Sequence, residues 1–151
     1  MEPDAVLVSN TREWLLRAKE DLNNAQHDLM ATPPFVRDAL FHCQQVAKKA
    51  TKAILTWHDS AFRKTHNLVE LGELCTRTDG TLAPAVEDVT PLTEYAARLR
   101  YPGAPWEPTL QEAQESIELA RIFLHAILKR LPPRITNFDD RSKDGTPATR
   151  V

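Results

Sequence analysis

The chain has 151 residues, 42% of them apolar and 26% charged, a composition typical of one globular domain with a single core. It contains no apolar run of the ~18 residues that a membrane span requires, and its N-terminus lacks a signal-peptide pattern, so we expect a cytoplasmic protein. Cys43 and Cys75 have neither a CxxC partner nor a metal-ligand spacing, which predicts reduced core residues and neither a metal nor another cofactor.

The net charge of -2 is distributed unevenly along the chain. Residues 35–66 carry six Lys or Arg and two acids, whereas residues 67–95 carry one Arg and six acids. A basic central segment between acidic neighbours suits packing by charge complementarity, and it equally suits a pocket for a phosphate-bearing ligand.

The first helix is predicted to begin at Asn10, because Glu13 three residues later completes a capping-box pattern, and to end near Met30. Its apolar face is formed by Trp14, Ala18, Leu22, Ala25 and Leu29. The prolines at 33 and 34 then stop this helix and start the central one, since proline is tolerated in a first helical turn.

The central helix is predicted from Phe35 to about His58, and its apolar residues recur at steps of three and four, the spacing of one buried face. That face consists of Phe35, Ala39, Cys43, Val46, Ala50, Ile54 and Trp57. A second line, which we call the polar stripe, follows its edge and consists of His42, Gln45, Lys49, Lys52 and Thr56. The polar stripe is either the solvated edge of a bundle helix or the wall of a binding site.

Three further helices are predicted from cap signals. Asn67 with Glu70 opens a short helix that ends at residues 78–80, and Thr90 before Pro91 opens another. Residues 101–108 hold three prolines and are predicted to be a loop, after which Thr109 with Glu112 opens the last helix, which we expect to run to Leu131.

The last helix carries apolar residues on two sides. One side is formed by Leu110, Ala113, Ile117, Ala120, Leu124, Leu128 and Leu131, and the other by Leu119, Ile122 and Ala126. We expect a second protomer to cover the second side, which predicts a homodimer. Residues 132–151 are polar and without periodicity, so we expect a disordered tail after a domain at 1–131. No segment alternates like a strand, so the predicted fold is an all-α antiparallel up-and-down helical bundle with one additional short helix.

Three motifs carry a resemblance to a known family. In order, they are FHCQQVAKKATKAIL from Phe41, KTHNL from Lys64 and LTEYAARLRYPG from Leu92, and they resemble the HEPN family over roughly residues 10–131. The resemblance implies an antiparallel helical bundle that is commonly a homodimer. Some HEPN members are non-catalytic partners of minimal nucleotidyltransferases, some have been proposed to bind nucleotides, and others are metal-independent ribonucleases.

Arg37 and His42 fit the pattern of the ribonuclease members, which is an Arg, four to six residues and a His. In that chemistry His acts as general base or acid on a ribose 2′-OH while Arg holds the phosphate. Residues five apart on a continuous helix point about 140° apart, so the pair would converge only across a dimer or from an irregular first turn. The alternative is that Arg37 is a solvated first-turn residue and the chain is not an enzyme.

A phosphate site is predicted where Gln45, Lys49 and Lys52 of the polar stripe meet basic residues from the loops. Those residues are Lys64, His66, Arg98 and Arg100. The free N–H groups of the helix that starts after His66 would also attract phosphate. The alternative is that acids of neighbouring helices, such as Glu70, Glu73 or Glu94, neutralise the lysines.

Three functional classes follow from these observations. The first is a non-catalytic HEPN-type nucleotide-binding or partner subunit that acts with a separately encoded minimal nucleotidyltransferase, and it is the one that we expect. The others are a metal-independent ribonuclease toxin of a toxin–antitoxin pair and a structural dimerisation module. The expected partners are therefore a second copy of the chain, the nucleotidyltransferase, and a nucleotide or RNA, without a membrane.

Overall fold

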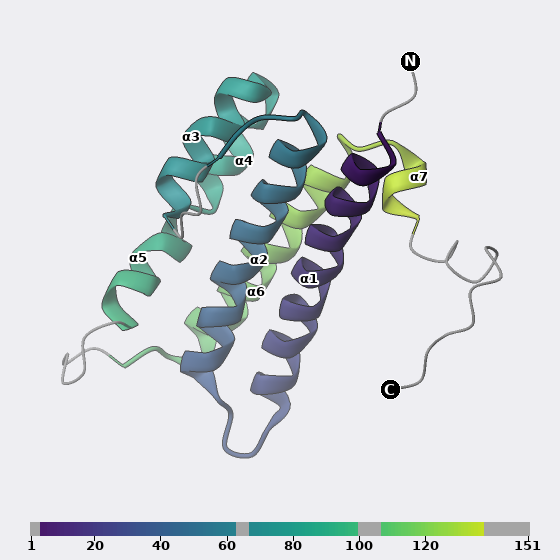
Figure 1. Ribbon diagram of the computed structural model, residues 1–151. Helices are drawn as coiled ribbons and strands as arrows, with labels where there is room; N and C mark the ends of the chain where they lie inside the picture. The colour runs from purple at the N-terminus through teal and green to yellow at the C-terminus, as the bar shows by residue number, and fades with distance from the viewer. Residues whose placement is uncertain (1–3, 63–66, 100–106, 138–151) are drawn as a thin grey trace, which may run out of the picture.

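The computed structural model describes residues 4–62, 67–99 and 107–137, and these residues form an all-helical bundle without a strand (Figure 1). The elements in chain order are α1 (Ala5–Met30), α2 (Val36–Trp57), α3 (Leu68–Thr78), the 3-10 turn η1 (Gly80–Leu82), α4 (Ala83–Asp88), α5 (Thr90–Leu99), α6 (Leu110–Leu128) and α7 (Pro133–Thr136). The three long helices α1, α2 and α6 lie side by side, and the shorter α3, α4 and α5 cover the side away from α1. The predicted all-α fold is confirmed.

The first helix begins earlier than its sequence pattern predicts. Asp4 is the N-cap of α1, and its carboxylate accepts a hydrogen bond of 3.0 Å from the backbone N–H of Val6. Asn10 and Glu13 are exposed interior residues of α1, so the interpretation of this pair as a cap was wrong. Both Asp4 and Asn10 are cap-forming residue types, and the helix starts at the earlier one. The predicted end at Met30 is confirmed.

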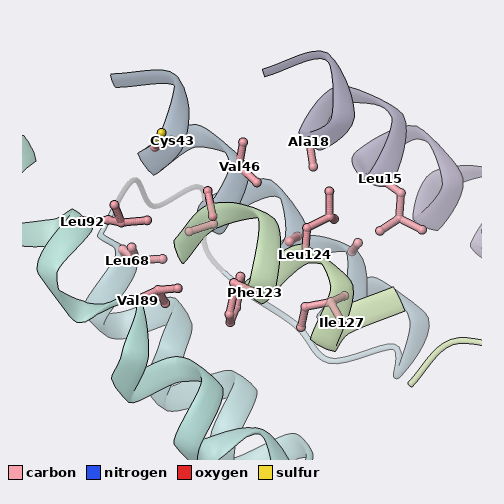
Figure 2. Close-up of a cluster of buried hydrophobic side chains, with 14 of the residues drawn as sticks. Leu15, Ala18, Cys43, Val46, Leu68, Val89, Leu92, Phe123, Leu124 and Ile127 are labelled. Atoms are coloured by element: carbon pink, nitrogen blue, oxygen red, sulfur yellow. The ribbon is translucent and has the colours of Figure 1, made fainter. Parts of the chain in front are cut away.

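The hydrophobic core lies between α2 and the helices that surround it (Figure 2). Cys43, Val46 and Ala50 have no exposed surface, as the spacing of α2 predicts, and burial raises the pKa of the Cys43 thiol to about 12. Phe35 differs from its prediction, because it precedes the first turn of α2 and is 56% exposed. Phe123 of α6, which neither predicted face includes, is 1% exposed, since helices cover α6 on two sides.

The second apolar side of α6 is only partly covered. Ile122 is 55% exposed, while Leu119 and Ala126 are half-buried beside α4. The predicted capping box of α6 is confirmed, because Thr109 and Glu112 exchange both of its hydrogen bonds, at 3.0 and 3.1 Å.

The region between α3 and α5 contains two short elements, η1 and α4, that the sequence patterns did not predict. Asn67 caps α3 as predicted, with its side chain accepting from the backbone N–H groups of Val69 and Glu70. A Cβ atom on Gly72 of α3 would lie 2.8 Å from Cγ1 of Val86 on α4, so this glycine permits the close approach of the two helices.

The packed chain continues past the expected domain boundary at Leu131. The short helix α7 contacts α1, and its Ile135 side chain has no exposed surface. The segment that we expected to be a disordered tail from residue 132 therefore begins with a turn of packed helix, while residues 138–151 lie outside the described part of the chain.

Candidate functional site

The polar stripe of α2 faces α1 and meets a carboxylate there. His42 Nδ1 lies 2.9 Å from Oδ1 of Asp21, and Lys49 Nζ donates to Oδ2 of the same side chain. The Asp21 side chain is only 10% exposed, so its charge is largely withdrawn from water and depends on these two partners. This arrangement is the charge-complementary packing that the sequence left as one of two interpretations.

A second carboxylate lies on the other side of the imidazole ring. Oδ2 of Asp28 is 3.8 Å from His42 Nε2, and this oxygen is buried without a hydrogen-bond partner. Burial raises the pKa of Asp28, with a smaller upward contribution from Asp38, while His42 and His27 lower it. We call the set Asp21, Asp28, His42 and Lys49 the α1–α2 charge cluster.

Lys52 also turns toward α1. Its Nζ lies 5.1 Å from the ring centroid of Trp14, a cation–π distance, and burial together with the nearby charge of Lys49 lowers its pKa. Gln45 is half-buried between these groups on the stripe. Lys49 and Lys52 thus both have partners on α1, and the neutralising acid for Lys49 is Asp21 rather than Glu70, Glu73 or Glu94.

Arg37 forms an ion pair outside the α1–α2 charge cluster. Its guanidinium donates to both carboxylate oxygens of Glu107, with Nη2–Oε1 at 2.7 Å and Nε–Oε2 at 3.3 Å. The two side chains are 45% and 75% exposed, and their hydrogen bonds raise the pKa of Arg37 and lower that of Glu107. Arg37 and His42 are therefore held by different acids from different parts of the chain.

The remaining predicted phosphate-binding residues do not join the cluster in the described part of the structure. Arg98 is an exposed residue in the last turn of α5, while Lys64, His66 and Arg100 lie outside the described residues. The loop side of the predicted phosphate site is thus not described, and its helical side is occupied by Asp21 and Trp14.

Sequence reasoning missed Asp21 and Asp28, although a signal for them exists. The two acids are seven residues apart on α1, two helical turns, and Asp21 lies between Ala18 and Ala25, whose side chains are fully buried. An acid that shares a helix face with core alanines needs a polar partner on the helix packed against it. His42 and Lys49, also seven residues apart on α2, match that spacing.

Within residues 4–62, 67–99 and 107–137, no three His, Cys, Asp or Glu side chains are grouped so that they could hold a metal ion. None of the helices in these ranges is long and apolar enough to cross a membrane.

A comparison with protein families supplies the remaining finding. The HEPN domain model matches residues 11–131, most of the chain, including most of α1 and all of α2 and α6. No curated protein and no solved structure gives a significant match. The family match includes all three motifs and covers nearly the range of the resemblance, and the chain therefore belongs to the HEPN domain family.

Proposed function

We propose that this chain is a non-catalytic HEPN subunit that acts in the cytoplasm as the partner of a separately encoded minimal nucleotidyltransferase. The observation that supports this proposal most directly is the position of His42 between two carboxylates, Asp21 and Asp28, while Arg37 is bound to Glu107. The family resemblance suggests the partner, since some HEPN members are non-catalytic partners of such nucleotidyltransferases.

The geometry disfavours ribonuclease chemistry at this pair. A general base needs a ring nitrogen within about 2.6–3.2 Å of the ribose hydroxyl. Because Asp21 holds Nδ1 of His42 at 2.9 Å, only Nε2 could act as the base, and Nε2 faces Asp28 at 3.8 Å. The negative charge of Asp28 would also repel the phosphate next to that hydroxyl. The alternative function as a ribonuclease toxin would therefore need other residues.

The charges also favour the partner role over nucleotide binding. With both carboxylates ionised, the α1–α2 charge cluster has no excess of positive charge even when His42 is protonated, because Lys49 is its only other cation. Lys52 is stacked over Trp14. A phosphate at the polar stripe would have to displace Asp21 from Lys49, which would leave a largely buried carboxylate with only His42 as a partner.

Three measurements on the purified full-length protein test this proposal. We expect no RNA cleavage in the presence of chelator, no binding of nucleotide at low salt, and co-purification with a nucleotidyltransferase encoded beside this chain. RNA cleavage that disappears in His42→Ala would overturn the non-catalytic assignment. Nucleotide affinity that falls with rising salt and is lost in Lys49→Ala would favour the phosphate site instead.

The partly covered side of α6 supports a homodimer as part of this proposal. Leu119, Ile122 and Ala126 line a hollow of about 440 Å³ beside Pro84 and Ala85 of α4, and Ile122 is half exposed at its edge. An isologous contact through this surface would remove these apolar side chains from water.

Ile122→Glu is expected to halve the mass measured by sedimentation at micromolar concentration, because a charge would then be buried in the interface. His125→Glu, at another exposed position of α6, is the matched control. A folded Ile122→Glu protein with the wild-type mass would place the interface elsewhere.

A further inference from the structure

A second hollow lies on the side of the bundle away from α1, between α3 and the junction of α4 and α5. Its volume is about 440 Å³, within the range of about 300–1,000 Å³ that is usual for ligand sites. α2 and α6 contribute Thr51 and Phe123, and α3 forms a wall from Leu68 to Arg77. We call this hollow the α3–α5 groove.

The inner surface of the groove is apolar. Leu68, Val89 and Phe123 lie close together in the core and are 6%, 3% and 1% exposed (Figure 2). The hydroxyl of Thr51 donates to the backbone oxygen of Ala47 at 2.8 Å, so its hydrogen-bonding capacity is used within α2. Val69 is 50% exposed beside the groove, which leaves apolar surface open to an incoming partner.

The surroundings of the groove are acidic. Glu73 lines it, and Glu87 and Glu94 directly follow the lining residues Val86 and Thr93 in sequence. These three carboxylates are exposed, and none forms an ion pair with another residue of the described part of the chain. Among the described residues that line the groove Arg77 is the single cation, so together with Glu73, Glu87 and Glu94 the local charge favours a basic partner.

We propose that the α3–α5 groove is the docking site for a helical segment of a partner protein that has an apolar face flanked by lysine or arginine. The apolar side chains of such a helix would enter the groove, which is the usual mode of helix-in-groove recognition. The stems of its lysines would lie along the apolar walls and their ammonium groups would reach Glu73, Glu87 and Glu94.

This inference rests on the proposed partner role and adds to it the surface and the chemistry of the contact. The groove favours an apolar, basic partner over a nucleotide, since its inner surface is apolar and the carboxylate of Glu73 lines it. It differs from the α1–α2 charge cluster, where His42 and Lys49 both already have Asp21 as an acidic partner.

The probe for the test is a fluorescent peptide of about five helical turns, built from leucine on one face and lysine on the others. Two control peptides have glutamate in place of lysine, or the leucine and lysine residues in scrambled order. Binding is measured by anisotropy with the full-length protein, and the contact surface is mapped by amide chemical-shift changes.

We expect Glu73→Lys with Glu94→Lys to weaken binding of the leucine–lysine peptide by about tenfold or more, because two favourable charge contacts become repulsive. Glu20→Lys with Glu118→Gln, exposed positions on α1 and α6, should leave the affinity unchanged. Thr93→Trp, which fills the groove without changing charge, should weaken binding as well. Shift changes should centre on α3 and α5, and circular dichroism checks that each variant is folded.

The inference would be overturned if Glu73→Lys with Glu94→Lys bound the peptide as tightly as Glu20→Lys with Glu118→Gln. It would also be overturned if the glutamate peptide bound as tightly as the lysine peptide, or if the chemical-shift changes centred on α1. A change in oligomeric state in Glu73→Lys would overturn it too, since the occupant would then be a second copy of this chain. If the nucleotidyltransferase co-purifies equally with wild-type protein and with the groove variants, the partner role stands and the groove assignment fails. If the peptide binds in the groove but no nucleotidyltransferase co-purifies, the groove stands and the proposed partner is wrong.

Discussion

The charged side chains near the two sides of α2 differ in whether they are paired. Toward α1, His42 and Lys49 are held by Asp21, whose side chain is 10% exposed, so the charges serve the packing of two helices. Toward α3 and α5, the carboxylates of Glu73 and Glu94 are exposed beside an apolar groove and form no ion pair within the described residues. Charges that are paired inside the fold are costly to separate, whereas unpaired charges around an apolar surface are available to a partner.

The largest effect is expected from breaking the α1–α2 charge cluster. Lys49→Ala should lower the free energy of unfolding by about 1–3 kcal/mol, because Asp21 would keep only His42 as a partner while remaining largely buried. Chemical denaturation at neutral pH measures the loss. Glu73→Ala beside the groove is the matched comparison and should change stability by less than about 0.5 kcal/mol.

A double-mutant cycle sharpens this prediction. In an Asp21→Asn background the Lys49→Ala change should cost less, since the charge that Lys49 neutralises is gone. An unchanged melting temperature in Lys49→Ala with Lys52→Ala would contradict the structural role of the lysines and would return the polar stripe to the phosphate-site interpretation.

Replacing Asp28 is expected to change the free energy of unfolding by a smaller amount and in the opposite direction. Its pKa is raised, chiefly by burial, so the folded protein binds this proton more tightly than the unfolded chain does. The stability associated with Asp28 is therefore complete below the unfolded pKa of about 3.9 and is lost as the pH rises through the folded pKa. Asp28→Asn should stabilise the protein at neutral pH by about 1 kcal/mol, because the neutral amide avoids an unpaired buried charge.

The pH dependence separates this explanation from a general effect of the substitution. The difference in unfolding free energy between Asp28→Asn and the wild type should shrink as the pH falls toward 3 and should be constant above the folded pKa. A destabilised Asp28→Asn at pH 7 would mean that the carboxylate has a partner that compensates its burial. Asp88→Asn, at an exposed position of α4, is the control.

The fold was predictable wherever short-range spacing decides it. The steps of three and four in α2 place Cys43, Val46 and Ile54 in the core, and all three have no exposed surface. The caps at Asn67 and Thr109 depend only on residues two or three positions away, and both are present. η1 and α4 were missed, although Asp79 caps η1 and Pro84 lies in the first turn of α4, because elements of three and six residues are too short to show a periodic apolar face.

The candidate site was predictable in position but not in its partners. The spacing of His42, Lys49 and Lys52 indicates a polar line beside the core, and these residues do lie at its edge. Which helix covers that line is a property of the tertiary packing, so the acid that binds Lys49 could not be chosen from blocks of charge along the chain. Asp21 and Asp28 both face α2 from α1, and the heptad spacing between them was the available signal.

The smallest effect is expected at the exposed ion pair between Arg37 and Glu107. Arg37→Ala should lower the melting temperature by at most ~2 °C, because exposed pairs gain little over their separate hydration. Arg17→Ala, which removes the exposed pair with Glu13, is the matched control and should give a change of the same size. Since the pair lowers the pKa of Glu107, its contribution is present above the unfolded pKa of about 4.3 and is lost as the pH falls. Added salt should reduce the contribution of the pair further.

A catalytic Arg37 would behave differently. In that case the wild type and Arg17→Ala would cleave RNA, whereas Arg37→Ala would not, although its melting temperature would be unchanged. This result would show that Arg37 acts on phosphate rather than on Glu107.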